Sequence, residues 1–166
     1  MALKKIAVLF LLAGFGVCLE AATVSFMVVE TGLSPEDGIN TCSSLWENGL
    51  LDVFFDAGHI VSSAPMLRLK DKPGGELPDE AKDDIAEAAE GGMDFFIVAI
   101  LEYHSGSGTE TGNTKPRQVS LRVFTTSPCR MLFEQQCTEK ANVSMDDEFA
   151  WVKQEARRLL PRLNDA

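Results

Sequence analysis

The sequence predicts an α+β domain in which helices pack on one mixed β-sheet, in the order β-α-β-α-β-β-β-α. Strand-like and helix-like segments alternate in the first part of the chain, as they do in parallel crossover units. The segment Met93–Tyr103 (MDFFIVAILEY) is apolar on both faces, which is typical of a central strand covered from both sides. Two strand-like segments follow it without an intervening helix, and this indicates an antiparallel meander.

The first strand and the first helix are expected between residues 23 and 58. Thr23–Glu30 is rich in β-branched and aromatic residues, as strands are. Ser34 can then cap a helix, and Pro35 suits the first helical position. Apolar and small residues continue with helical spacing to Ala57, and Gly58 is suited to end the helix.

The middle of the chain predicts a second strand and a second helix. His59–Leu69 has strand character, but Pro65 cannot donate to a ladder, so the strand is interrupted there or lies at an edge. Leu77–Glu90 carries an apolar stripe and ends at Gly91 and Gly92.

The last third predicts the hairpin and the closing helix. A polar connection, Ser105–Pro116, leads to the alternating strand Gln118–Thr126, a tight turn and the strand Arg130–Thr138. Met145–Leu163 then forms an amphipathic helix with acids at its start and arginines at its end, which suits the helix dipole. These arginines are also a candidate anion or partner patch: Arg157, Arg158 and Arg162.

Residues 1–22 have the order of a secretory signal peptide, which leaves 23–166 as a single domain. Two lysines precede an uncharged run, Ile6–Val17, that is too short to span a bilayer comfortably. Small residues follow, so we expect cleavage after Ala21 or Ala22. The mature protein is therefore expected to be exported, most simply to a bacterial periplasm.

Cys18 gives an alternative, because it lies where a lipoprotein carries its acylated cysteine. Val17 precedes it, whereas a small residue is usual at that position, so ordinary cleavage is the preferred interpretation. Acylation of Cys18 would tether the protein to the outer membrane or another bilayer, and only in that case is a membrane contact expected.

The chain is acidic, with a formal net charge of −10 that becomes −11 when Lys4, Lys5 and Glu20 leave with the signal peptide. Binding to nucleic acid depends on neutralising phosphates with Lys and Arg, so the charge argues against nucleic acid as a partner. An acidic surface that keeps an exported protein soluble explains the composition.

Three cysteines remain in the mature chain: Cys42, Cys129 and Cys137. Cys129 and Cys137 flank a predicted strand and so lie roughly 26 Å apart, whereas a disulfide needs Cα atoms about 4.4–6.8 Å apart. If a disulfide forms, it is therefore expected to join Cys42 to one of the other two, and three buried reduced thiols are the alternative.

The sequence contains no GxSxG, HExxH, P-loop or dinucleotide-binding motif, and no cofactor is expected. Glu102 and His104 follow the apolar central strand and share one face of it, so they could bind a metal or move a proton. The alternative is a strand end that reaches solvent, and on balance the chain is not expected to be an enzyme.

The opening VSFMVVETGLSPED, a strand that leads into a capped helix, combines with this element order and a signal peptide. The combination resembles the small α+β domains of bacterial envelope proteins. These include the amino-terminal domain of the translocation protein TolB, the curli-secretion lipoprotein CsgG and the lipoprotein activator of a penicillin-binding protein. The resemblance implies a protein–protein adaptor in the periplasm, and it transfers no functional residue.

The expected function is thus a non-catalytic protein-binding or scaffold domain of a bacterial cell envelope, whose partner is another envelope protein. One alternative is an exported enzyme or metal binder that uses Glu102 and His104. Another is a carrier for a small apolar ligand held between the sheet and the helices.

Overall fold

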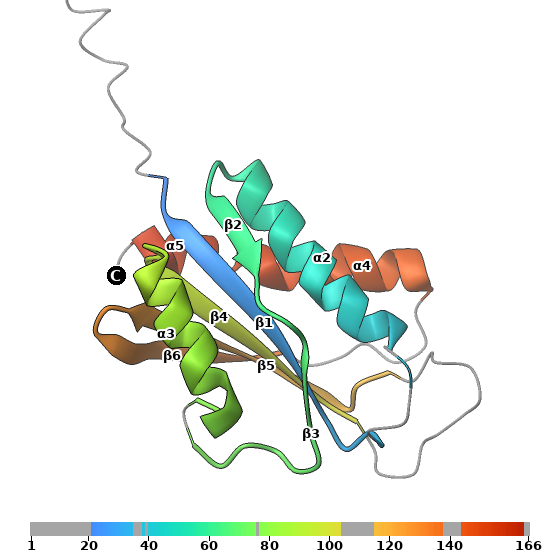
Figure 1. Ribbon diagram of the computed structural model, residues 1–166. Helices are drawn as coiled ribbons and strands as arrows, with labels where there is room; N and C mark the ends of the chain where they lie inside the picture. Colours follow the sequence, from blue (N-terminus) through green and yellow to red (C-terminus); the bar gives the residue numbers. More distant parts are fainter. Residues whose placement is uncertain are drawn as a thin grey trace, which may run out of the picture.

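A computed structural model describes residues 21–34, 38, 40–75, 77–103, 115–137 and 144–164. They form one mixed six-stranded sheet with helices packed on both faces, which confirms the predicted α+β class (Figure 1). The strands are β1 (Thr23–Thr31), β2 (Ile60–Ser63), β3 (Leu67–Leu69), β4 (Phe95–Glu102), β5 (Gln118–Thr126) and β6 (Cys129–Cys137). The helices are α2 (Thr41–Asp56), a 3₁₀ turn η1 (Asp79–Ala81), α3 (Lys82–Glu90), α4 (Met145–Arg157) and α5 (Leu160–Asn164).

The strand order is β2-β1-β4-β5-β6, and β3 pairs with the second half of β1. β1 is parallel to β2, β3 and β4, whereas β4, β5 and β6 are successive antiparallel neighbours. This is the predicted combination of crossover connections and a meander. β4 is buried along almost its whole length, as expected for a central strand.

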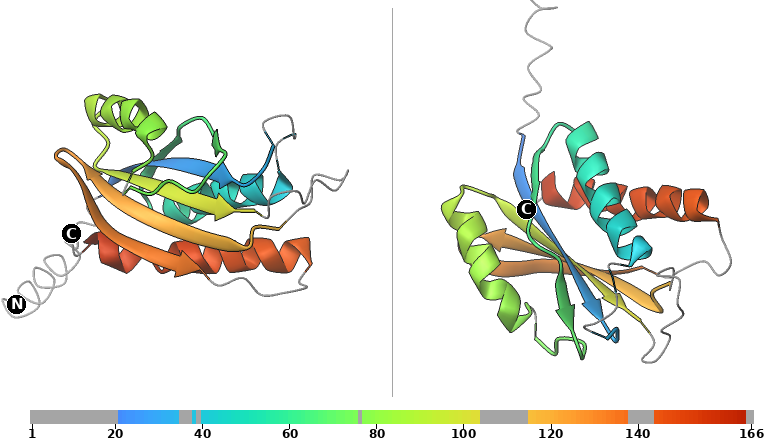
Figure 2. Two further views of the ribbon diagram at one scale, coloured as in Figure 1. Left: turned by 90° about the horizontal axis from the view of Figure 1, so that it is seen from below. Right: turned by 45° about the vertical axis from the view of Figure 1, so that its right-hand side comes forward.

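The two faces of the sheet have separate hydrophobic cores. α2 and α4 cover one face, where Trp46, Trp151 and Phe54 pack with the odd-numbered apolar residues of β4 and β5. α3 covers the other face with Ala81 and Ile85. Figure 2 shows α3 on the opposite side of the sheet from α2 and α4. Below, these are called the α4 face and the α3 face.

The first helix begins later than predicted. Asn40, not Ser34, is the N-cap: its side-chain oxygen accepts a hydrogen bond from the Cys42 amide at 2.9 Å. Ser34 instead presents its carbonyl to Arg68. The predicted start was therefore wrong, because the side chain that caps α2 is that of Asn40 and the helix begins at Thr41. The predicted end was correct, since Gly58 follows the helix with φ +88°.

The predicted strand His59–Leu69 consists of two short strands, β2 and β3, separated at Ala64–Met66. Pro65 lies in this gap, and both strands are at the edge of the sheet. Because proline has no N–H to donate to a ladder, both predicted effects occur: the strand is interrupted, and it lies at the edge of the sheet.

The last predicted helix is divided in two. Pro161 has no N–H to donate to the carbonyl of Arg157, so α4 ends at Arg157 and α5 begins at Leu160. The helix expected at Leu77–Glu90 likewise begins late, with a 3₁₀ turn at Asp79 and regular α-helix from Lys82.

Candidate functional site

The carboxyl ends of the parallel strands β1, β3 and β4 meet at one end of the sheet (Figure 1). From there β1 leads to α2 on the α4 face, whereas β3 leads to α3 on the other face. Neighbouring strands whose connections leave in opposite directions form a switch point, where ligands bind in many open α/β sheets. This end of the sheet is therefore the first candidate for a site.

A buried ion pair joins β1 and β3 at the switch point. Glu30 is fully buried, and Arg68 Nε donates to its Oε2 at 2.7 Å. The Nη2 atom of Arg68 contacts the same oxygen. Arg68 also donates to the carbonyls of Ser34 and Gly38, both at 3.1 Å. Arg68 thereby ties the β1–α2 connection to the sheet, which is a structural role.

Tyr103 lies beside this pair on the α4 face. Its hydroxyl and that of Ser43 in α2 are 2.8 Å apart, and both side chains are buried. Burial raises the pKa of the Tyr103 phenol far above its usual value, so it is protonated at neutral pH and does not act as a base. Gly32 directly contacts the Tyr103 carbonyl and has φ +82°, so only glycine fits there.

Of the candidate Glu102–His104 pair the structure describes only Glu102, because His104 lies outside the described residues. Glu102 forms an ion pair with Lys72 from the β3–α3 connection. Among the residues that the structure describes, no group of three His, Cys, Asp or Glu side chains is arranged to hold a metal ion. The Glu102–His104 site remains a hypothesis without structural support.

A further buried acid follows the same pattern. Glu148, in the first turn of α4, is almost fully buried, and its Oε2 is 2.9 Å from Lys115 Nζ. Sequence reasoning did not find the Glu30–Arg68 or Glu148–Lys115 pairs. A signal exists for Glu30, since it is an acid at the end of an otherwise apolar strand. Glu30 and Glu148 each form an ion pair with a cationic side chain, which favours structural roles for these two acids.

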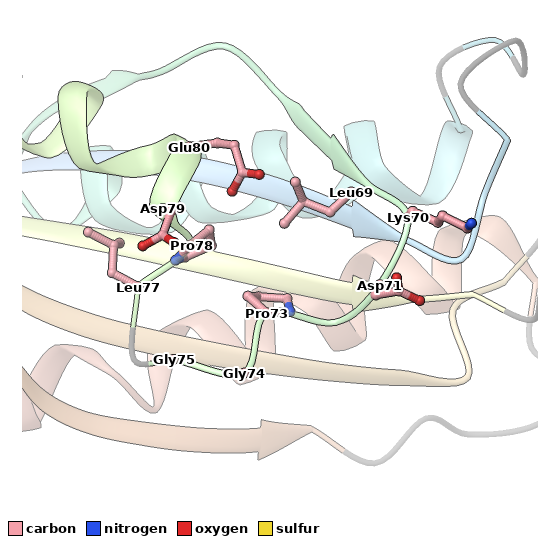
Figure 3. A pocket seen from close by; sticks show the side chains of 10 residues that line it. All are labelled: Leu69, Lys70, Asp71, Pro73, Gly74, Gly75, Leu77, Pro78, Asp79 and Glu80. Atoms are coloured by element: carbon pink, nitrogen blue, oxygen red, sulfur yellow. The ribbon is translucent and has the colours of Figure 1, made fainter.

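A pocket of about 410 Å³ lies in the β3–α3 connection. Figure 3 shows that its lining comes from one continuous segment, with Leu69 at one end and Glu80 at the other. An apolar ligand carrier was expected to have a cavity between the sheet and the helices. This pocket is instead lined by the end of β3, the loop that follows it and the start of η1, so it gives the carrier hypothesis no support.

The β6 edge, residues Cys129–Cys137, is the second candidate surface. Within the described ranges β6 pairs with β5 alone, which leaves its outer side open. Most of its side chains are exposed or half-buried. β2 and β3, at the other edge of the sheet, have four and three residues, whereas β6 has nine. A long open edge is a template for pairing with another chain.

The three described cysteines are free thiols. Cys129 and Cys137 lie at opposite ends of β6, as expected, so the structure agrees that they do not pair with each other. Cys42 and Cys137 are buried, and Cys129 is exposed. The predicted disulfide from Cys42 remains a prediction. Cys18 and the rest of the predicted signal peptide up to residue 20 lie outside the described residues. Among the residues that are described, no helix is long and apolar enough to cross a membrane.

Comparison with known proteins gives one family and several distant structural similarities. The model of a family described as "Uncharacterised protein" matches residues 23–142. No curated protein matches the sequence. A PelC dodecamer from Paraburkholderia phytofirmans has 11% identity and a TM-score of 0.45, over 85% of this chain and 88% of that chain.

Two other solved structures are similarly distant. The hypothetical protein CT253 from Chlamydia trachomatis has 12% identity and a TM-score of 0.42, over 86% of this chain and 95% of that one. The competence damage-inducible protein A (ComA) from Klebsiella pneumoniae has 13% identity and a TM-score of 0.37, over 85% and 84%. These three are not the envelope proteins named above, and similarity at this level carries no argument about function.

Proposed function

The chain belongs to the family of uncharacterised proteins whose model spans residues 23–142, and we propose that it is an exported, non-catalytic protein-binding domain of a bacterial cell envelope. The observation that carries the proposal is the open, nine-residue β6 edge. A partner segment that adds a strand there gains main-chain hydrogen bonds, as in other cases of β-strand addition.

The proposed location of the protein depends on its first residues. A cationic start, the apolar run Ile6–Val17 and the small residues Ala21 and Ala22 support export through a cleaved signal peptide. An exported domain without a catalytic motif and with one long open edge is suited to act as an adaptor between envelope proteins.

Site-specific photo-crosslinking in the native cells tests the proposal. A photo-reactive residue replaces the exposed Gln136 of β6 in one variant, and Ile60 of the opposite edge in the control. Ile60 is 60% exposed, so both positions are accessible to a neighbouring protein. We expect a discrete protein adduct from position 136 and none from position 60. Adducts in equal amounts from both positions, or none from position 136, would contradict the proposal.

A further inference from the structure

The β6 edge is chemically different on its two faces, and this difference indicates which segment it binds. A register shift between Val123 and Phe124 leaves Leu132 as an extra residue in β6. Arg130 therefore pairs with Thr125, and Phe133 pairs with Val123. Directly opposed residues point to the same face, so the bulge places Arg130 on the α4 face together with Phe133.

The helices add two arginines to the same side of the edge. The guanidinium of Arg162, in α5, lies 3.6 Å from the ring centroid of Phe133. Arg158 donates to Glu155 Oε1 at 2.6 Å, and the other carboxylate oxygen of Glu155 accepts from Gln135 of β6 at 3.0 Å. Arg162 thus contacts β6 directly, and Arg158 is connected to β6 through Glu155.

Arg130, Arg158 and Arg162 form what we call the arginine rim. All three are exposed, and Glu155, the acid that contacts Arg158, is buried and shared between Arg158 and Gln135. The other face of the edge carries an acid instead, Glu134, whose Oε1 accepts from Gln136 and lies 3.6 Å from Arg122 Nε. A local excess of cations in a protein of net charge −10 needs an explanation beyond solubility.

We propose that the β6 edge binds an extended, acidic segment of a partner protein as an added strand, with the acidic side chains on the α4 face against the arginine rim. Side chains alternate between the faces of a strand, so acids at every second position would meet the rim. The inference rests on the proposed function and specifies the chemistry of the partner.

A partner segment fits this edge better than a second copy of the chain. Charges are screened within about 8 Å at physiological salt, so a single strand interacts mainly with the rim. A second copy brings its whole acidic surface, and two chains of net charge −10 repel each other. The occupant is therefore a segment of another protein.

Peptide binding to the full chain tests the inference. The probe is a short peptide that alternates Thr and Glu, and its matched control alternates Thr and Lys. We expect the Glu peptide to bind, to slow amide hydrogen exchange in β6 and to bind less tightly as salt is added. Equal binding of the Lys peptide, protection at β2 instead of β6, or no binding of the Glu peptide would overturn the inference.

A pair of double variants isolates the rim. Arg130→Gln with Arg162→Gln should weaken binding of the Glu peptide about fivefold at low salt. Lys70→Gln with Lys82→Gln makes the same change in net charge away from β6 and should leave binding unchanged. Equal effects of the two double variants would also overturn the inference. If the photo-reactive residue at position 136 still crosslinks to a partner in cells, the proposed function stands and only the specificity for acidic segments is wrong.

Discussion

At the scale of single residues, one glycine decides how closely α2 and α4 approach. A Cβ atom at Gly49 would lie 2.5 Å from Val152 Cγ1, well inside van der Waals contact. Next to it, Trp46 of α2 and Trp151 of α4 meet edge to face, with ring centroids 5.3 Å apart. The absence of a side chain at position 49 therefore permits the contact between the two helices that cover the α4 face.

Replacing Gly49 by Ala should destabilise the protein although alanine favours helices. Overpacking costs about 1–3 kcal/mol, and the gain in helix propensity offsets about 1 kcal/mol of it. We expect a net loss of up to about 2 kcal/mol in the free energy of unfolding, measured by urea denaturation. Asn48→Ala, at the exposed neighbouring position, is the control and should not lower stability. An unchanged or raised urea midpoint for Gly49→Ala would show that the helices can separate without cost.

The buried thiol of Cys137 should make the free energy of unfolding depend on pH in the alkaline range. Burial raises the pKa of its thiol from 9.0 to about 12, with a further contribution from the charge of Glu155. The folded state therefore keeps a proton that the unfolded state loses. Its contribution is fully present below pH 9 and is lost as the pH rises toward 12.

Urea midpoints measured from pH 8 upward test this dependence. The wild-type protein should lose stability more steeply above pH 9 than Cys137→Ala, which has no thiol to titrate. Equal slopes for the two proteins would mean that the thiol is accessible to water. The exposed Cys129 provides a control, because Cys129→Ala should retain the wild-type slope.

At the scale of elements, the Glu30–Arg68 pair joins β3 to the end of β1, from which it is separated by 38 residues in sequence. It links β1 to β3, and through the carbonyls of Ser34 and Gly38 it holds the connection to α2. Glu30 is fully buried, so its charge depends on Arg68. Removal of one partner from such a pair leaves an uncompensated buried charge.

Arg68→Met should therefore cost about 3–5 kcal/mol in the free energy of unfolding. The double variant Glu30→Met, Arg68→Met removes both charges and should be more stable than Arg68→Met alone. Chemical denaturation of the wild type, both single variants and the double variant gives the coupling energy. Additive effects would show that the two side chains do not stabilise each other.

At the scale of the whole molecule, the chain enters the fold just after the predicted cleavage site. The Thr23 amide donates to Asp94 Oδ2 at 2.8 Å, the Ala22 amide donates to His59 Nδ1 at 3.2 Å, and the Ala22 carbonyl accepts from the Ile60 amide at 3.0 Å. Cleavage after Ala21 preserves these hydrogen bonds, whereas cleavage after Ala22 removes two of them.

We predict that the intact mass of the protein from its native cells corresponds to a chain that starts at Ala22, which retains all three of these hydrogen bonds. An unchanged mass on reduction would agree with the free thiols that the structure has at Cys42, Cys129 and Cys137. A chain that starts at Cys18 and carries acyl groups would instead establish a tethered lipoprotein. A mass gain on reduction would establish the disulfide from Cys42.

Much of the fold could be predicted because local patterns encode it. The burial of Phe95–Glu102 follows from its apolar composition, and the hairpin of β5 and β6 follows from alternation around a turn. The candidate site was harder to predict from the sequence. Glu102 was singled out for its place at a strand end, but its contact with Lys72 depends on the β3–α3 connection.

The sequence by itself determined the α+β class, the central strand and the end of α2 just before Gly58, because periodicity and backbone preference are local properties. Only the tertiary structure decided that α2 begins at Thr41 and that Glu30 pairs with Arg68, 38 residues away. It also decided that the bulge in β6 turns Arg130 toward the α4 face. These features depend on strand register and on contacts between distant segments, and no local pattern specifies either of them.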